Sequence, residues 1–205
     1  MAPEQASAGP RAGVRGRSEA RERLLATASG LFYGEGIRAV GVERILAEAA
    51  VTRATFYRHF PSKEELVLAY LRGVDGQTRA GVQSAVDATS SAGEALREIG
   101  SALADALARP EFRGCAFLKA AAEFSDPEDP VRKLVLEHRA WYFETLAELF
   151  TQAFGDLAGR PQPRHAARHF LMMRDGAMSG AHLDGAAELG AALERGVNGL
   201  LTVIH

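Results

Sequence analysis

The chain has 205 residues, of which 47% are hydrophobic and 24% are charged, and its formal net charge is −2. This apolar fraction supports a globular core and excludes a chain that is disordered throughout. The near-neutral charge carries no overall nucleic-acid signature, so any contact with nucleic acid must come from a local cluster.

Cysteine content and apolar runs indicate the compartment. Cys115 is the single cysteine, so an internal disulfide is excluded and a reducing compartment is favoured. No run approaches 18 apolar residues, and residues 1–10 lack the apolar segment of a secretory signal. We therefore expect a cytoplasmic protein with no membrane partner.

Residues 1–17 contain mainly Ala, Gly, Pro and Arg without periodicity, which predicts a flexible basic arm. One interpretation is an ordinary disordered terminus. The alternative is an arm whose Arg11, Arg15 and Arg17 reach a DNA phosphate or the minor groove.

The next segment predicts four helices. The first is expected to begin near Ser18 and to end at Gly34, because apolar residues recur at helical spacing between them. A second helix is expected over 41–49 and a third over 53–59. Ser62, followed three residues later by Glu, is a capping box that predicts the start of a fourth helix. In that helix Gly73 and Gly76 suggest fraying or a bend.

The remainder is rich in alanine and shows no strand alternation. Helices are expected at 92–108, 112–124, 130–154, 163–182 and 186–203. The fold class is therefore all-α, with a helix-turn-helix domain at 18–75 and a larger helical domain at 76–205.

Residues 41–63 predict two short helices joined by a tight turn, which is the layout of a helix-turn-helix DNA reader. Phe56 and Phe60, four residues apart, face inward. The free face then holds Arg53, Ala54, Tyr57 and Arg58. Arg53 at the helix start suits a bidentate contact with guanine, and Ala54 suits a thymine methyl. Glu43 is a candidate acceptor from cytosine, although a solvated glutamate is its ordinary role.

Residues 18–71 resemble the TetR/AcrR family of bacterial transcription regulators. The similarity rests mainly on Leu-Leu-Ala-Thr-Ala-Ser-Gly-Leu-Phe-Tyr-Gly-Glu-Gly-Ile at 24–37 and Thr-Phe-Tyr-Arg-His-Phe-Pro-Ser-Lys-Glu-Glu-Leu at 55–66. Two residues depart from the family pattern: Ala50 stands where glycine is usual, and Gly41 where Thr or Ser is usual. Alanine in the turn predicts either a negative φ or local strain.

The resemblance implies about nine helices and a homodimer that binds a palindromic double-stranded operator. It also implies that several residues contact phosphates or bases: Thr52, Thr55, Tyr57, His59 and Lys63. The alternative for Tyr57 and His59 is that they only fill the core of the helix-turn-helix domain. We expect a repressor that is released by a small molecule.

In family members the second half binds the effector, which predicts an apolar pocket there with a few polar side chains that can bind the ligand. The candidates are Phe112, Cys115, Phe117, Phe124, His138, Trp141, Tyr142, Phe170 and Met173. Aromatic residues on helices are more often plain core, which is the alternative for each of them. The predicted effector is apolar or aromatic.

The last two helices carry small residues that allow close approach, and by resemblance this pair forms the dimer interface. The candidates are Leu171, Gly176, Ala177, Gly180, Ala181, Leu193, Val197, Leu200 and Leu201. Ordinary packing within one chain would need the same residues.

Metal and enzyme chemistry are not expected. His165 and His169 have a zinc-compatible spacing but no His-Glu-x-x-His glutamate and no evident third ligand. No nucleophile elbow, phosphate loop or nucleotide fingerprint occurs in the sequence. We predict no cofactor and no enzymatic activity. The alternatives to a repressor are an activator with the same head and a helical small-molecule-binding protein.

Overall fold

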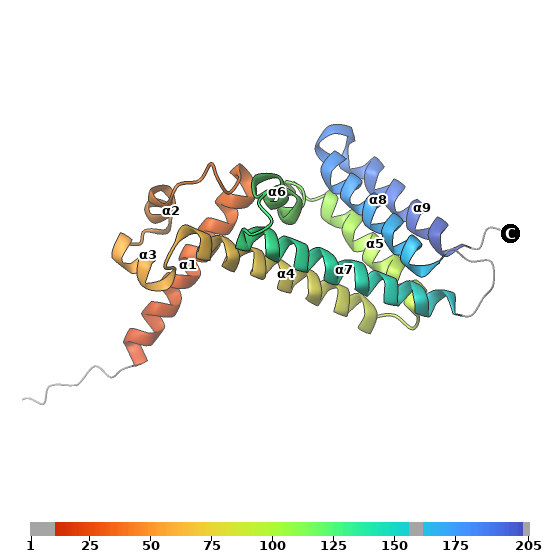
Figure 1. Cartoon of the computed structure of the whole chain (residues 1–205), viewed down its shortest axis with the longest axis horizontal. Helices are drawn as coiled ribbons and strands as arrows, with labels where there is room; N and C mark the ends of the chain where they lie inside the picture. The colour runs from red at the N-terminus through yellow and green to blue at the C-terminus, as the bar shows by residue number, and fades with distance from the viewer. Residues whose placement is uncertain (1–10, 156–161, 203–205) are drawn as a thin grey trace, which may run out of the picture. The chain divides into compact units, whose positions relative to one another are not determined.

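The computed structural model describes residues 11–155 and 162–202, in which every regular element is an α-helix (Figure 1). The helices are α1 (Arg11–Glu35), α2 (Val42–Ala49), α3 (Arg53–His59), α4 (Lys63–Asp87), α5 (Ala92–Leu107), α6 (Ala116–Glu123), α7 (Pro130–Phe154), α8 (Pro163–Asp184) and α9 (Ala186–Leu201). The all-α prediction is confirmed. None of these described helices is long and apolar enough to cross a membrane. The chain divides into unit 1, Met1–Tyr70, and unit 2, Leu71–His205.

Unit 1 is a helical head in which α1, α2 and α3 pack on one another. The side chains of Leu24, Ile45 and Phe56 are fully buried at its centre. The ring of Tyr70, from the part of α4 that belongs to this unit, lies 5.8 Å from the ring of Phe32. The apolar spacing seen in the sequence therefore corresponds to the buried face of the helices.

Helix α1 begins at Arg11, seven residues before the expected start at Ser18. Starting a helix orders several residues for a single hydrogen bond, whereas extending a formed helix gains one hydrogen bond for each residue ordered. The helix therefore extends through the two glycines in this stretch. Residues 1–10 of the predicted arm lie outside the described residues. The same holds for the side chains of Arg11, Arg15 and Arg17, so their proposed DNA contacts stay predictions.

Local capping shapes the reader segment as the sequence predicts. Thr52 Oγ1 accepts a hydrogen bond from the Thr55 N–H at 3.2 Å and begins α3. Ser62 Oγ accepts from the Glu65 N–H at 3.1 Å at the start of α4. Each cap satisfies a backbone donor that the first turn of a helix leaves without a partner.

The turn between α2 and α3 contains the departure noted at Ala50. Ala50 ends α2 in the left-handed region, with φ 50° and ψ 49°, and is the one non-glycine residue with positive φ among those described. The Val51 N–H donates to the carbonyl of Leu46 at 3.1 Å and closes the helix end. Of the two outcomes expected for alanine here, the structure has the strained one, at a cost of about 1–2 kcal/mol.

Unit 2 is a helical bundle in which α5 packs on α7 and α9, and α8 packs on α7 and α9. Its core includes the fully buried Phe150 and Phe170. Close approach of α5 and α9 depends on glycine, because a Cβ at Gly190 would lie 3.1 Å from the Cβ of Ala104. The helices of this unit thus meet at distances that only small residues permit.

Two further features of the helices differ from expectation. Helix α4 continues without a break through Gly73 and Gly76 to Asp87. Helix α6 begins at Ala116 rather than at residue 112, because Gly114 has φ +92° and the chain turns there. Helical hydrogen bonding along α4 therefore outweighs the low propensity of two glycines, which costs about 1 kcal/mol each.

Candidate functional sites

The outer face of α3 presents most of the predicted DNA-contacting residues to solvent. Thr52, Arg53, Ala54, Tyr57 and Arg58 are exposed, while Phe56 between them is buried. The side chain of Tyr57 is 47% exposed, and its ring meets Phe56 edge-on at 5.1 Å. Tyr57 therefore lies on the surface of the head and not within its core.

The other three predicted contacts are half-buried: Thr55, His59 and Lys63. The Lys63 ammonium lies 5.9 Å from the centre of the Phe32 ring, so its stem covers part of the head's core. Thr55 Oγ1 accepts a hydrogen bond from Thr52 Oγ1 at 3.0 Å. For His59 both interpretations, phosphate contact and core filling, stay open.

Arg53 forms an ion pair with Glu43, which joins the start of α3 to the start of α2. The side chains are 63% and 69% exposed. An exposed pair of this kind contributes about 0–1 kcal/mol, so a guanine edge can replace Glu43 at little cost. Two of the three residues considered for base reading, Arg53 and Glu43, therefore lie next to each other.

Unit 2 contains a partly open cavity of about 210 Å³ between α6, α7 and α8. Its lining residues are Cys115, Phe117, Leu118, Ala121, Arg132, Val135, Leu136, His138, Arg139, Tyr142, Leu171 and Arg174. Four of the nine predicted effector residues are among them: Cys115, Phe117, His138 and Tyr142.

The other five predicted effector residues lie elsewhere: Phe112, Phe124, Trp141, Phe170 and Met173. Phe170 belongs to the core, where its ring is 6.4 Å from that of Phe150. Met173 packs over Gly196 of α9. The plain-core alternative therefore describes Phe170 and Met173.

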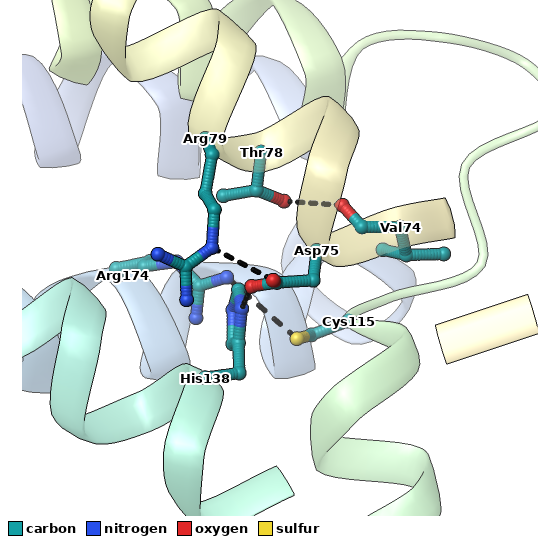
Figure 2. Close-up of polar contacts among 7 residues, drawn as sticks. All are labelled: Val74, Asp75, Thr78, Arg79, Cys115, His138 and Arg174. Carbon is teal, nitrogen blue, oxygen red and sulfur yellow. Dashed lines mark hydrogen bonds and ion pairs between the residues drawn. The ribbon is translucent and has the colours of Figure 1, made fainter. Parts of the chain in front are cut away.

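Beside the cavity lies a polar cluster that connects α4 to α7 (Figure 2). His138 Nδ1 donates to Asp75 Oδ1 at 2.7 Å, and Arg79 Nε donates to the other oxygen at 2.7 Å. The ring of Phe117 stacks on that of His138, with centres 3.7 Å apart. The imidazole is thus held in one orientation by a hydrogen bond to Asp75 and by stacking on the ring of Phe117.

Burial and charge decide the protonation state of this pair. Burial, which is the largest effect, lowers the pKa of His138, and the charges of Arg174 and Arg79 lower it further. Together they outweigh the hydrogen bond and charge of Asp75, which raise it. Burial tends to raise the pKa of Asp75, but the hydrogen bonds from His138 and Arg79 outweigh it and lower that pKa. At neutral pH the pair is a carboxylate and a neutral imidazole, whose Nε2 is then an acceptor.

Arg174 is a buried guanidinium on the wall of the cavity, with 6% of its surface exposed. Its Nη1 donates to Asp175 Oδ1 at 3.0 Å. Its Nη2 lies 3.7 Å from Cys115 Sγ (Figure 2). Its Nε is buried without a hydrogen-bond partner. A buried donor in that state costs about 1–3 kcal/mol.

Sequence reasoning missed Arg174, although a signal exists. Counted along α8, Arg174 follows Phe170 and Leu171 by four and three residues and precedes Ala177 by three. All three neighbours are buried, so Arg174 is a charged residue on an apolar stripe. A charge at such a position needs a partner or marks a function.

The predicted dimer residues divide into two groups. Five are buried in the core of one chain: Leu171, Ala177, Leu193, Val197 and Leu201. Gly176 is exposed, and Gly180, Ala181 and Leu200 are half-buried. For the first group the packing-within-one-chain alternative describes what the structure shows. On α8, the residues that project large apolar side chains into solvent are Met172, 61% exposed, and Leu183, 84% exposed.

The histidine pair considered for zinc, His165 and His169, is exposed on α8. Within 11–155 and 162–202, no three His, Cys, Asp or Glu residues are grouped so as to hold a metal ion.

A helix-turn-helix head with an exposed second helix, followed by a helical unit with its own cavity, defines a class of DNA-binding regulators. Comparison with known families agrees. The sequence model described as bacterial regulatory proteins, tetR family, matches residues 24–70. The model described as Tetracyclin repressor-like, C-terminal domain, matches residues 92–197. The chain belongs to the TetR family of DNA-binding transcriptional regulators.

Among solved structures, the TetR-family regulator SCO4454 from Streptomyces coelicolor is 46% identical, with a TM-score of 0.85 over 90% of this chain and 95% of that one. The transcriptional activator FasR of Mycolicibacterium smegmatis is 37% identical over 40% of this chain. The transcriptional repressor KstR2 of Mycobacterium tuberculosis is 36% identical over 38% of it. These two matches span 37% and 38% of the relatives' own lengths. Regulators of this family bind DNA operators, act as dimers and are not enzymes.

Proposed function

We propose that this protein is a cytoplasmic, homodimeric repressor that leaves a palindromic operator when a small molecule occupies the cavity of unit 2. The observation that carries the proposal is that one helix, α4, contains residues of the DNA-reading unit and also Asp75, which is bonded to the cavity residue His138. A DNA reader and a ligand cavity thereby share a structural element.

In this proposal Arg53, Ala54 and Tyr57 read base edges in the major groove. Thr52, Thr55, Arg58, His59 and Lys63 hold the head on the phosphate backbone. Support comes from the exposure of the α3 face and from the weak pairing of Arg53 with Glu43. Two heads related by a two-fold axis would read half-sites about 34–36 Å apart.

The dimer is proposed to form through α8 and α9. Met172, Gly176 and Leu183 follow one another at four and seven residues, so they lie on one face of α8. Gly176 adds no side chain, which permits close approach. Met172 and Leu183 are exposed in the single chain, and a second copy would remove their apolar surface from water.

Release is proposed to work by a shift between two states of α4. A ligand in the cavity contacts His138, and His138 holds Asp75 of α4. If one state of α4 binds the ligand better, occupancy increases that state in proportion to the difference in affinity. Because α4 is one continuous helix from Lys63 to Asp87, a shift at Asp75 is carried along its backbone.

A second candidate function is activation with the same head. The relative FasR is a transcriptional activator and the relative KstR2 is a transcriptional repressor. Sequence similarity of this extent therefore occurs with both activators and repressors. In vitro transcription from a promoter bearing the operator distinguishes the two. An increase in transcript on adding the protein would favour activation.

The direct test is fluorescence anisotropy with the DNA that flanks this chain's own coding region, against a scrambled fragment of equal composition, across a range of salt concentrations. We expect tight binding of the natural fragment that weakens with salt. Equal affinity for both fragments at every salt concentration would contradict sequence-specific DNA binding.

A further inference from the structure

Arg174 lies on the wall of the cavity, and one edge of its guanidinium carries donors that the protein leaves without a strong hydrogen bond. Nε–H and one Nη2–H lie side by side on that edge of the planar group, an arrangement that matches the two oxygens of a carboxylate. Nε has no hydrogen-bond partner, and Nη2 lies 3.7 Å from the Cys115 sulfur. The guanidinium carbon also lies 4.9 Å from the centre of the Tyr142 ring. The opposite nitrogen, Nη1, is bonded to Asp175 and keeps the group in place.

The positive charge around this edge is only partly compensated. Asp175 forms ion pairs with two arginines. Arg139 Nη1 lies 2.7 Å from its Oδ2, and Arg174 Nη1 lies 3.0 Å from its Oδ1. Of the described residues that line the cavity, Arg132, Arg139 and Arg174 are basic and none is acidic. The wall therefore favours an anion over a neutral or cationic molecule.

Cavity size limits the anion. A cavity of about 150 Å³ lined by apolar residues accommodates benzene, and this one measures about 210 Å³. The additional volume suits one carboxylate group. Phe117, Tyr142 and Leu171 supply apolar contacts for the rest of the molecule.

We propose that the cavity binds a small monocarboxylate of about the size of benzoate, with its carboxylate paired side-on to Nε and Nη2 of Arg174. This assignment names the effector class and rests on the proposed function in treating this cavity as the effector site. An apolar body alone leaves Arg174 Nε without a partner, whereas a carboxylate satisfies it and balances its charge.

The test is isothermal titration calorimetry on the full-length protein. The probes are sodium propionate, benzoate and phenylacetate, each compared with its uncharged primary alcohol, and sodium phosphate as an inorganic anion. We expect at least one carboxylate to bind with one site per chain and its alcohol to bind at least about tenfold more weakly. Binding of the alcohols but not of the carboxylates, or of none of the probes, would overturn the inference. Phosphate binding in place of every carboxylate would also overturn it.

Variants locate the site. Arg174→Met removes the charge with an apolar chain that suits a buried position, and we expect the affinity for the carboxylate to fall about 10–100-fold. Arg174→Lys retains a charge but not the paired donors, so an intermediate loss is expected. Arg164→Lys, on the same helix but paired with Glu144 outside the cavity, is the matched control and should bind as the parent does.

Circular dichroism and thermal unfolding confirm that each variant is folded. A folded Arg174→Met that binds the carboxylate unchanged would refute the assignment.

Operator binding is measured separately, in the presence of the carboxylate that binds best. Carboxylate binding without operator release would leave the inference standing and would contradict the ligand-responsive part of the proposed function. Release by the uncharged alcohols alone would support that function and overturn the inference.

Discussion

His138 donates through Nδ1 to Asp75 Oδ1 across 2.7 Å, and this hydrogen bond connects α7 to α4 at the edge of the unit 2 cavity. The acceptor oxygens of Asp75 are both used, since Arg79 holds the second one. The guanidinium of Arg79 also lies 4.1 Å from the ring of Trp141. A residue next to the cavity and a residue on α4 are therefore parts of one hydrogen-bonded group.

The pH dependence of stability should report this pair. The folded pKa of His138 lies below its ordinary value of 6.5, so below that pH the unfolded chain binds more protons than the folded one. The free energy of unfolding should therefore decrease as the pH falls through about 6.5, and should decrease further when Asp75, whose pKa is also lowered, protonates in still more acidic solution.

Urea unfolding at about pH 7.5 and about pH 5.5 measures the effect. His138→Gln should lose less stability between these two conditions than the parent protein. His165→Gln, at an exposed position of α8, controls for the removal of an imidazole. An equal pH response in the His138→Gln and parent proteins would contradict the prediction.

Base reading by Arg53 can be separated from its ion pair with Glu43. We expect Arg53→Ala to cost about 1–3 kcal/mol on the operator and to relax preference at one base pair. Lys63→Ala should weaken binding to every sequence and reduce the salt dependence. Anisotropy titrations on operator and scrambled DNA give both results, and equal losses on the two DNAs for Arg53→Ala would remove it from base reading.

Glu43→Gln decides what Glu43 does. If Glu43 only pairs with Arg53, its replacement should change operator affinity by less than about 1 kcal/mol, because the exposed pair is weak. A large loss of discrimination at a cytosine would instead identify Glu43 as a reader of that base. Titrations against single-base operator variants distinguish these outcomes.

The left-handed backbone at Ala50 predicts a stabilising substitution. Ala50→Gly removes a strain of about 1–2 kcal/mol and loses about 0.5–1 kcal/mol to unfolded-chain entropy, so a net gain of up to about 1.5 kcal/mol is expected. Ala47→Gly, at an exposed helical position three residues earlier, should destabilise by a similar amount. Thermal and urea unfolding compare the pair; destabilisation by both glycines would argue against strain at Ala50.

The close contact between α5 and α9 predicts a site-dependent response to alanine. At Gly190 a Cβ would lie 3.1 Å from the Cβ and 3.4 Å from the Cα of Ala104, so Gly190→Ala must separate the helices and should cost about 1–3 kcal/mol. Gly81→Ala meets no atom within 4 Å and should stabilise α4 by about 0.5–1 kcal/mol. Opposite signs in urea unfolding are expected, and equal shifts would show that the contact is looser than described.

The dimer proposal can be tested at the exposed face of α8. Met172→Glu would place a carboxylate in each copy near the two-fold axis, and like charges in an interface cost several kcal/mol. We expect analytical ultracentrifugation to show the monomer at concentrations where the parent is dimeric. Ala140→Glu, at an exposed position of α7, adds the same charge outside the proposed interface and should leave the dimer intact. A dimeric Met172→Glu would exclude this face.

Most of the helices could be predicted because their signals are local. Apolar spacing, the capping threonine at 52 and the capping serine at 62 act within one or two turns, so they are legible without tertiary structure. The same holds for the reader helix, where Phe56 and Phe60 define the inner face and leave Arg53 and Tyr57 outside. The early start of α1 and the unbroken α4 were not predicted, because helix extension depends on neighbouring turns and not on a single glycine.

The effector cavity was only partly predictable, since its walls come from α6, α7 and α8, which are distant in sequence. Composition marked Phe170 and Met173 as strongly as Phe117 and Tyr142, although packing places the first two away from the cavity. Likewise, the small residues of α8 and α9 do not indicate which face of each helix packs on α5 and which face is available to a second copy of the chain. Leu193 and Val197 turn out to face the core of their own chain.

By itself, then, the sequence determined an all-helical DNA-binding regulator and the residues on its reading helix, because helical periodicity and capping are set by neighbours along the chain. Tertiary structure decided that Arg174 is buried with its Nε lacking a hydrogen-bond partner and that His138 is held by Asp75. These are relations between side chains on different helices, and they exist only after the helices pack.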